Sequence, residues 1–159
     1  MKNQLAVILF ADIVGYSALM ERDQDKALEH VRALRAKFLE PVAAEHGGRV
    51  LKRLGDGWII AFDAMASCVD CAMQVQTGML ALKGVQLRIG CHFGDIVEEG
   101  EDIYGSGVNI AARIQAEAPP GGIMVSDDMM RQLSGTQAEA MKEAGVFRLK
   151  NIAQPVRLY

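Results

Sequence analysis

The chain has 159 residues, of which 50% are hydrophobic and 23% charged, and its formal net charge at pH 7 is -3. This length suits one domain with a sizeable core, and the composition is that of a globular protein rather than a disordered or fibrous one. The slightly acidic balance argues against a general nucleic-acid binder and against a protein held to anionic membranes by charge.

The first apolar run ends at Asp12, far short of the roughly 20 residues of a membrane span, and it lacks the layout of a cleavable signal. We therefore expect no membrane span and a cytoplasmic location. The cysteines Cys68, Cys71 and Cys91 do not form a disulfide framework, and no second Cys or His pair completes a zinc site with Cys68 and Cys71. We expect all three to be small buried or half-buried residues.

Residues 4–12 are almost wholly apolar, which predicts a central strand buried on both faces, with Asp12 at its exit. A long helical stretch follows Ser17 and ends at Gly47-Gly48, with Pro41 expected to bend it. The turn before this helix has free backbone N–H groups that suit an anion such as a polyphosphate. No Walker phosphate loop occurs in the sequence.

Residues 49–62 predict a β-hairpin, because two runs rich in Val, Ile, Leu and aromatic residues flank Gly55-Asp56-Gly57. Taken alone, Asp56 is a turn former and Lys52 a solvated strand residue. The second strand-end carboxylate, Asp12, changes this interpretation. Two such carboxylates side by side would form a hard-oxygen site suited to Mg²⁺ or Mn²⁺.

The remaining pattern alternates helices and strands. It predicts a helix over 65–82, a strand over 85–95, a strand over 96–104 that pairs back through an acidic turn at 98–100, a helix over 105–118, a strand over 123–125, a helix from Ser126, and terminal strands over 146–150 and 155–159. Residues 1–159 therefore predict one domain of the α+β class, a ferredoxin-like sandwich with an antiparallel-rich sheet covered by helices.

Asn109 and Arg113 are four residues apart on the helix over 105–118, so they project from the same side. Arginine can stabilise phosphoryl charge, and asparagine can fix a sugar or phosphate oxygen. Taken alone, the pair is weak evidence, and an exposed helix face is the more ordinary explanation. Lys150 on its own is weaker evidence, since a strand-end lysine is usually just solvated.

Three ordered motifs resemble those of the class III nucleotidyl cyclase catalytic domain. They are Phe10-Ala11-Asp12-Ile13-Val14-Gly15-Tyr16-Ser17, Leu51-Lys52-Arg53-Leu54-Gly55-Asp56-Gly57 and Asp102-Ile103-Tyr104-Gly105-Ser106-Gly107-Val108-Asn109-Ile110-Ala111-Ala112-Arg113. The closing Leu149-Lys150-Asn151-Ile152 with Pro155-Val156 also resembles that family's last strand pair.

The resemblance implies roles for these residues. Asp12 and Asp56, with the backbone carbonyl of Ile13, match the positions that hold two Mg²⁺ or Mn²⁺ ions for attack of the ribose 3′-hydroxyl on the α-phosphate. Asn109 and Arg113 match the pair that orients the ribose and stabilises the α-phosphate, and Lys150 matches a lysine that binds the triphosphate. Unlike some members, this chain has no basic residue between Gly94 and Asp102.

Lys52 and Asp102 match the two positions that select the purine. Adenine offers an acceptor at N1 and a donor at N6, which complement a lysine and an aspartate, whereas guanine would oppose donor to donor and acceptor to acceptor. ATP is therefore the expected substrate. The resemblance also implies a head-to-tail homodimer, in which the aspartates of one chain and the purine, Asn and Arg positions of the other form each site.

We therefore expect an adenylate cyclase that converts ATP to 3′,5′-cyclic AMP and pyrophosphate. The alternatives are a guanylate or mixed-specificity cyclase and a catalytically silent module for nucleotide binding or dimerisation. Regulatory domains in a longer chain are also expected as partners.

Overall fold

The computed structural model describes residues 2–141, 145–147 and 156–159. Its elements follow the order β1 (Lys2–Ile13), α1 (Tyr16–Arg22), α2 (Gln24–Ala33), the π-helical turn η1 (Leu34–Phe38), α3 (Glu40–Glu45), β2 (Arg49–Leu54), β3 (Gly57–Phe62), α4 (Met65–Met79), β4 (Leu87–Glu99), β5 (Asp102–Tyr104), α5 (Ser106–Glu117), β6 (Ile123–Val125), α6 (Asp127–Met130), α7 (Gly135–Ala140), β7 (Gly145–Phe147) and β8 (Val156–Leu158).

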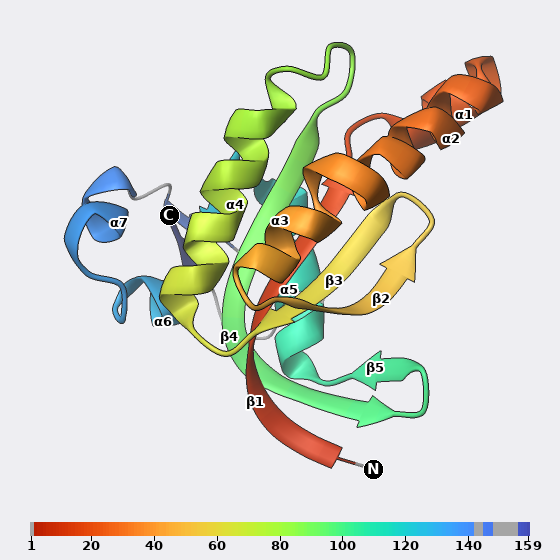
Figure 1. The fold of residues 1–159 in the computed structure, drawn as a ribbon. Coiled ribbons are helices and arrows are strands. Elements are labelled where there is room, and N and C mark those ends of the chain that lie inside the picture. Colours follow the sequence, from red (N-terminus) through yellow and green to blue (C-terminus); the bar gives the residue numbers. More distant parts are fainter. Residues whose placement is uncertain (1, 142–144, 148–155) are drawn as a thin grey trace.

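The central sheet has the strand order β2-β3-β1-β4-β5, and all neighbours on this path are antiparallel. β6 pairs with β4 in parallel, and β7 and β8 form a small antiparallel sheet. This small sheet adjoins β6, because Val125 and Tyr159 exchange two backbone hydrogen bonds of 2.8 and 2.9 Å. Figure 1 shows α3 and α4 on one face of the central sheet and α5 on the other. The predicted α+β sandwich is confirmed.

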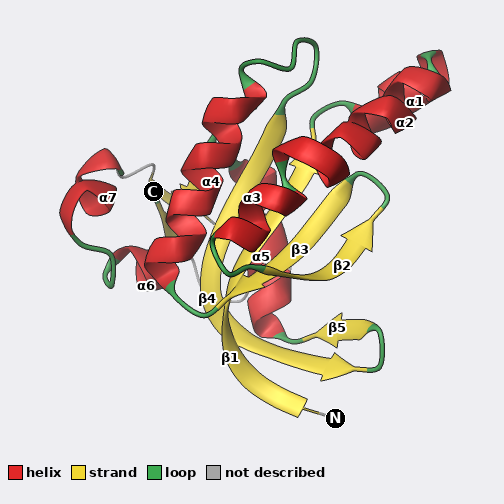
Figure 2. Cartoon of the chain, viewed as in Figure 1, coloured by secondary structure: helices red, strands yellow, loops and turns green. Residues whose placement is uncertain are grey.

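β1 is buried on both faces, as its apolar sequence predicts. Val7, Leu9 and Ala11 join the larger core, which also takes residues from α2, η1, α3 and α4. Ala6 and Ile8 face the opposite way and join a smaller core with Val108 and Ala111 of α5. The cartoon in Figure 2 shows this two-sided covering of the sheet. Side chains alternate along a strand, so an all-apolar strand needs a helix layer on each side.

The helical stretch after Ser17 is interrupted rather than bent. α2 starts again at Gln24 after Asp23, whose side chain accepts a hydrogen bond from the backbone N–H of Lys26 at 3.1 Å. Farther on, the Leu39 N–H donates to the carbonyl of Leu34 at 2.9 Å, which closes the π-helical turn before Pro41. Proline lacks an N–H and clashes with the preceding turn, so the chain rearranges just before it.

The strand pair after α4 also differs from its prediction. Residues 96–99 continue β4 as one strand, and only Asp102–Tyr104 turns back, so that Val97 pairs with Tyr104 and Glu99 with Asp102. Gly100, at a φ of 62°, provides the left-handed residue of the tight turn. The turn therefore falls later than the expected 98–100.

Where the structure describes the terminal strands, they are the antiparallel pair β7 and β8. Residues 148–150 and 155 of the predicted strands, including Lys150, lie outside the described residues. The three cysteines are free and buried, and burial raises the pKa of Cys71 to about 12. In the part of the chain that the structure describes, every helix is too short or too polar to cross a bilayer.

Candidate active site

The exit of β1 and the turn between β2 and β3 bring Asp12 and Asp56 together. Asp12 pairs with Gly57, the residue after Asp56, in the β1–β3 register. The backbone N–H of Ile13 also donates to the carbonyl of Asp56 at 3.1 Å, which ties the strand exit to the turn. A Cβ on Gly57 would lie 3.2 Å from the Ala11 carbonyl oxygen, so this close pairing favours glycine.

The two carboxylates are half-buried and repel each other. Burial, and then the negative charge of Asp56, raise the pKa of Asp12, while the hydrogen bond from Gln115 and the charge of Arg88 act in the opposite direction. Burial also raises the pKa of Asp56. Both effects penalise the ionised carboxylates in the absence of a counter-ion.

Gln115 and Arg88 complete this cluster, and neither was predicted from the sequence. The Gln115 side-chain amide donates to Oδ1 of Asp12 at 2.6 Å. Arg88 lies directly opposite Asp12 in the β1–β4 register, and its Nε donates to the Ala118 carbonyl at the end of α5 at 2.9 Å. The alternation along β4 was visible in the sequence, but the register that places Arg88 against Asp12 was not.

The donor set fits a hard divalent cation. Asp12 and Asp56 offer carboxylate oxygens, and Ile13, the residue after Asp12, offers a backbone carbonyl, which are the ligand types that Mg²⁺ and Mn²⁺ prefer. Among residues 2–141, 145–147 and 156–159, no group of three His, Cys, Asp or Glu side chains could hold a metal. A metal held here would therefore need oxygen ligands from its substrate or from water as well.

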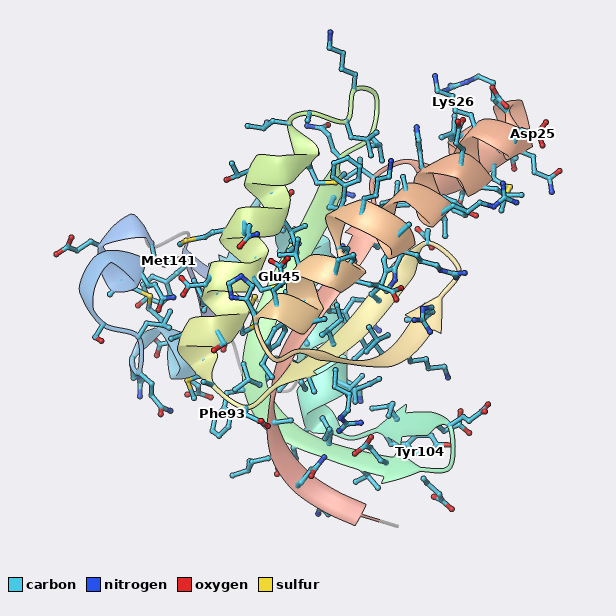
Figure 3. All side chains as sticks on the ribbon, viewed as in Figure 1. Asp25, Lys26, Glu45, Phe93, Tyr104 and Met141 are labelled. Carbon is cyan, nitrogen blue, oxygen red and sulfur yellow. The ribbon has the colours of Figure 1, made fainter. Side chains whose placement is uncertain are left out.

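Lys52 and Asp102 meet at a second place in the chain, across an open groove between β2 and the β4–β5 hairpin. Their Nζ and carboxylate oxygen are 3.3 Å apart, and the Tyr104 hydroxyl donates to the other Asp102 oxygen at 3.3 Å. Arg49 and Glu98 form a further ion pair of 3.0 Å in this groove. Figure 3 shows Tyr104 on the hairpin, well away from Asp25 and Lys26 at the α1–α2 end.

Asn109 and Arg113 lie on α5, as predicted. Asn109 is exposed and Arg113 half-buried, whereas Gln115 on the same helix is buried. At about 100° per residue, Arg113 and Gln115 project about 160° apart around the helix axis, from nearly opposite sides. Since Gln115 is the residue that reaches Asp12, Arg113 points away from the aspartates of its own chain.

The hairpin that carries Lys52 and Asp56 is fixed to α3 by one carboxylate. Glu40 accepts two hydrogen bonds from Arg53, of 2.8 and 2.6 Å, and one from the indole N–H of Trp58 at 2.8 Å. The bonds from Arg53 and Trp58 lower the pKa of Glu40 despite its partial burial. Trp58 itself is fully buried.

Comparison with known proteins identifies the family. Residues 2–157 match the family model described as the adenylate and guanylate cyclase catalytic domain. A crystal structure titled adenylate/guanylate cyclase/hydrolase from Silicibacter pomeroyi superimposes with a TM-score of 0.87 at 36% identity, covering 99% of this chain and 95% of that one. The chain therefore belongs to the class III adenylate and guanylate cyclase catalytic domains.

Two curated relatives carry names that specify the nucleotide. "Putative adenylate cyclase 3" of Rhizobium meliloti is 39% identical over 99% of this chain, and the adenylate cyclase of Streptomyces coelicolor is 30% identical over 91%. The chain spans only 28% and 38% of the lengths of these relatives.

Proposed function

We propose that this chain is an adenylate cyclase catalytic domain that converts ATP to 3′,5′-cyclic AMP and pyrophosphate. The observation that carries the proposal is the pair of half-buried, mutually repelling carboxylates of Asp12 and Asp56 at the strand exit. In the reaction, the ribose 3′-oxygen loses its proton to solvent water and bonds to the α-phosphorus. The bond from that phosphorus to the oxygen bridging it to the β-phosphate breaks, and pyrophosphate leaves.

Asp12, Asp56 and the carbonyl of Ile13 would hold two Mg²⁺ or Mn²⁺ ions. When bound, such ions lower the pKa of the 3′-hydroxyl and neutralise charge on the triphosphate. The two aspartates must be ionised to bind them, and their raised pKa values mean that the metal-free protein resists this ionisation. A bound dication would offset the repulsion between the two ionised carboxylates. Asp12 and Asp56 are therefore better suited to holding a cation than to a structural role.

Lys52 and Asp102 support ATP over GTP. They present a cation with N–H donors and a carboxylate acceptor next to each other in one groove, which is the pair that the N1 and N6 edge of adenine requires. Guanine carries a donor at N1 and an acceptor at O6, so the same pair would leave both unsatisfied.

The orientation of α5 supports a homodimer with shared sites. Arg113 points away from the aspartates of its own chain, so it would complete the site of a partner, together with Asn109. A head-to-tail two-fold dimer makes two such sites from identical chains. Lys150 remains the proposed triphosphate ligand, and Arg88, opposite Asp12 in the strand register, is a second candidate cation for that role.

The proposal is tested by incubating the purified protein at high concentration with Mn²⁺ and either ATP or GTP, and identifying the product by mass spectrometry. Cyclic AMP from ATP alone, absent with Asp12→Ala, is the expected result. Cyclic GMP would overturn the substrate assignment. Nucleotide binding without either product would favour a silent module or a domain that needs a regulator.

A further inference from the structure

We propose that Gln115 is a positioning residue that holds Asp12 in the orientation that binds metal. This inference rests on the proposed function, because it assigns Gln115 a role at the proposed metal site. The hydrogen bond joins residues 103 positions apart in the chain, from the last turn of α5 to the exit of β1. It is short, at 2.6 Å, and its donor is only 4% exposed.

The amide of Gln115 fixes the geometry of Asp12. It occupies a lone pair of Oδ1, which restricts the side-chain rotation and leaves Oδ2 and the remaining Oδ1 lone pair for other partners. The carboxylate is thereby oriented for a cation, as hydrogen bonds to metal-ligating carboxylates commonly do.

The backbone around Gln115 leaves little freedom in this contact. A Cβ built on Gly90 of β4 would lie 2.5 Å from the backbone nitrogen of Gln115 and 2.7 Å from its Cα. A Cβ on Gly107, near the start of α5, would similarly lie 2.5 Å from the Asp95 carbonyl oxygen. The helix therefore rests directly on β4 at both of its ends, and glycine at these two positions allows Gln115 to reach Asp12.

The two sides of α5 serve different parts of the proposed sites. The side toward the sheet carries Gln115, which contacts Asp12 of the same chain. The outer side carries Asn109 and Arg113, which would serve the partner's site. A displacement of α5 would therefore change both half-sites together, because the same rigid element holds Asp12 in place and presents Arg113.

The test uses the isostere Gln115→Met, which keeps the length and most of the volume of the side chain but removes the donor. The matched control is Gln76→Met, because Gln76 is a half-buried glutamine whose amide donates to the backbone carbonyls of Leu87 and Gly122 and to no aspartate. Mn²⁺ is titrated into each protein without nucleotide, and free Mn²⁺ is followed by electron paramagnetic resonance. Asp12→Asn is included in the same series.

Mn²⁺ binding should weaken about tenfold in Gln115→Met and stay at the wild-type level in Gln76→Met. The Mn²⁺ concentration for half-maximal activity should rise by a similar factor, while the KM for ATP at saturating Mn²⁺ stays unchanged. A merely structural glutamine would produce neither selective effect. Circular dichroism tests whether each variant folds. If Gln115→Met does not fold, Gln115→Asn replaces it, because its side chain keeps the amide but is too short to reach Asp12. This variant should show the same loss of Mn²⁺ affinity.

Two outcomes separate this inference from the proposed function. Wild-type Mn²⁺ affinity in the Gln115 variant, with binding lost in Asp12→Asn, overturns the role of Gln115 alone. Wild-type affinity in Asp12→Asn overturns the metal site itself, and with it both proposals.

Discussion

The two polar clusters of this chain balance their charges in opposite ways. At the strand exit, Asp12 and Asp56 place two negative charges together in a half-buried position, where burial raises the pKa of each. In the groove beside the β4–β5 hairpin, Lys52 and Asp102 pair opposite charges, and both side chains are more than a third exposed. In the first cluster Arg88 offsets the two carboxylate charges only in part, whereas the second cluster is already neutral without a base.

This difference suggests how each cluster responds to its ligand. A cation at the aspartates relieves repulsion, so binding there should stabilise the fold. A base in the groove must instead compete with an existing ion pair, whose contribution at this exposure is small, about 0–1 kcal/mol. We therefore expect metal binding to change stability more than base binding does.

The largest effect should come from breaking the first cluster. Asp56→Ala removes one of the two proposed metal ligands and should lower cyclic AMP formation by a factor of about 1,000 or more, because a bound metal supplies several kcal/mol to the transition state. Product is measured by mass spectrometry, and circular dichroism tests whether the fold is kept. Near-normal turnover in a folded variant would contradict the metal assignment.

Mixing Asp56→Ala with Arg113→Ala tests whether the aspartates and the arginine belong to sites shared between chains. Each variant alone should be inactive, but half of the dimers in a random mixture are mixed, and each of these has one whole site. About a quarter of wild-type activity should return. Proven mixed dimers without any rescue would argue that each site is built within one chain.

Reversing the second cluster tests the purine assignment while keeping the ion pair. The double variant Lys52→Glu with Asp102→Lys exchanges acceptor and donor, so it should lower turnover of ATP relative to GTP by about 10- to 100-fold, equivalent to about 1–3 kcal/mol of discrimination. Initial rates with both nucleotides give the ratio. An unchanged ratio would mean that the base does not contact this pair.

The hairpin that links the two clusters can be loosened through Glu40. Glu40→Ala removes the acceptor for Arg53 and leaves the buried indole N–H of Trp58 unsatisfied, so unfolding should become easier by about 1–2 kcal/mol. The pKa of Glu40 is below its ordinary value of 4.5. The ionised carboxylate should therefore contribute fully to the free energy of unfolding above pH 4.5, and this contribution should be lost as the pH falls through the lowered pKa.

Chemical denaturation at pH 7 and at acidic pH measures this contribution. The control is Glu45→Ala, which removes an exposed carboxylate from the same helix (Figure 3). Equal losses in the two variants would assign no special role to the Glu40 network.

The smallest expected effect is a gain in the thermal stability of the metal-free protein when Asp12 loses its charge. The raised pKa of Asp12 means that the folded metal-free chain binds more protons than the unfolded chain, so stability falls as the pH rises from the ordinary aspartate pKa through the folded-state value. Asp12→Asn lacks this penalty and should raise the metal-free Tm at pH 7 by about 1–3 °C. Differential scanning calorimetry measures it, with the exposed Asp95→Asn as control. A lower Tm in Asp12→Asn would show that the favourable contacts of the ionised carboxylate outweigh the repulsion.

Much of this fold was predictable because its central strand is chemically unambiguous. The apolar run over residues 5–11 of β1 requires two covering layers, and the Gly55-Asp56-Gly57 turn favours a hairpin. The pairing of Lys52 with Asp102 was not visible in local pattern, since it depends on how the β4–β5 hairpin approaches β2.

The missed features share one physical cause. Arg88 and Gln115 reach Asp12 through strand register and through the close approach of α5 at Gly90, and neither can be derived from side-chain periodicity. The interruption before Pro41 was expected only as a bend, because apolar residues spaced every three or four positions do not distinguish a bent α-helix from one broken by a short π-helical turn. The roles of Lys150 and the other site residues remain predictions.

Trp58 gives the hairpin an optical reporter. It is the only tryptophan in the sequence, it is fully buried, and it lies two residues after Asp56. Its fluorescence therefore arises from one environment, in which the indole N–H is bonded to a carboxylate. Changes in emission during a metal or nucleotide titration would follow this hairpin in the unmodified protein, without an attached dye.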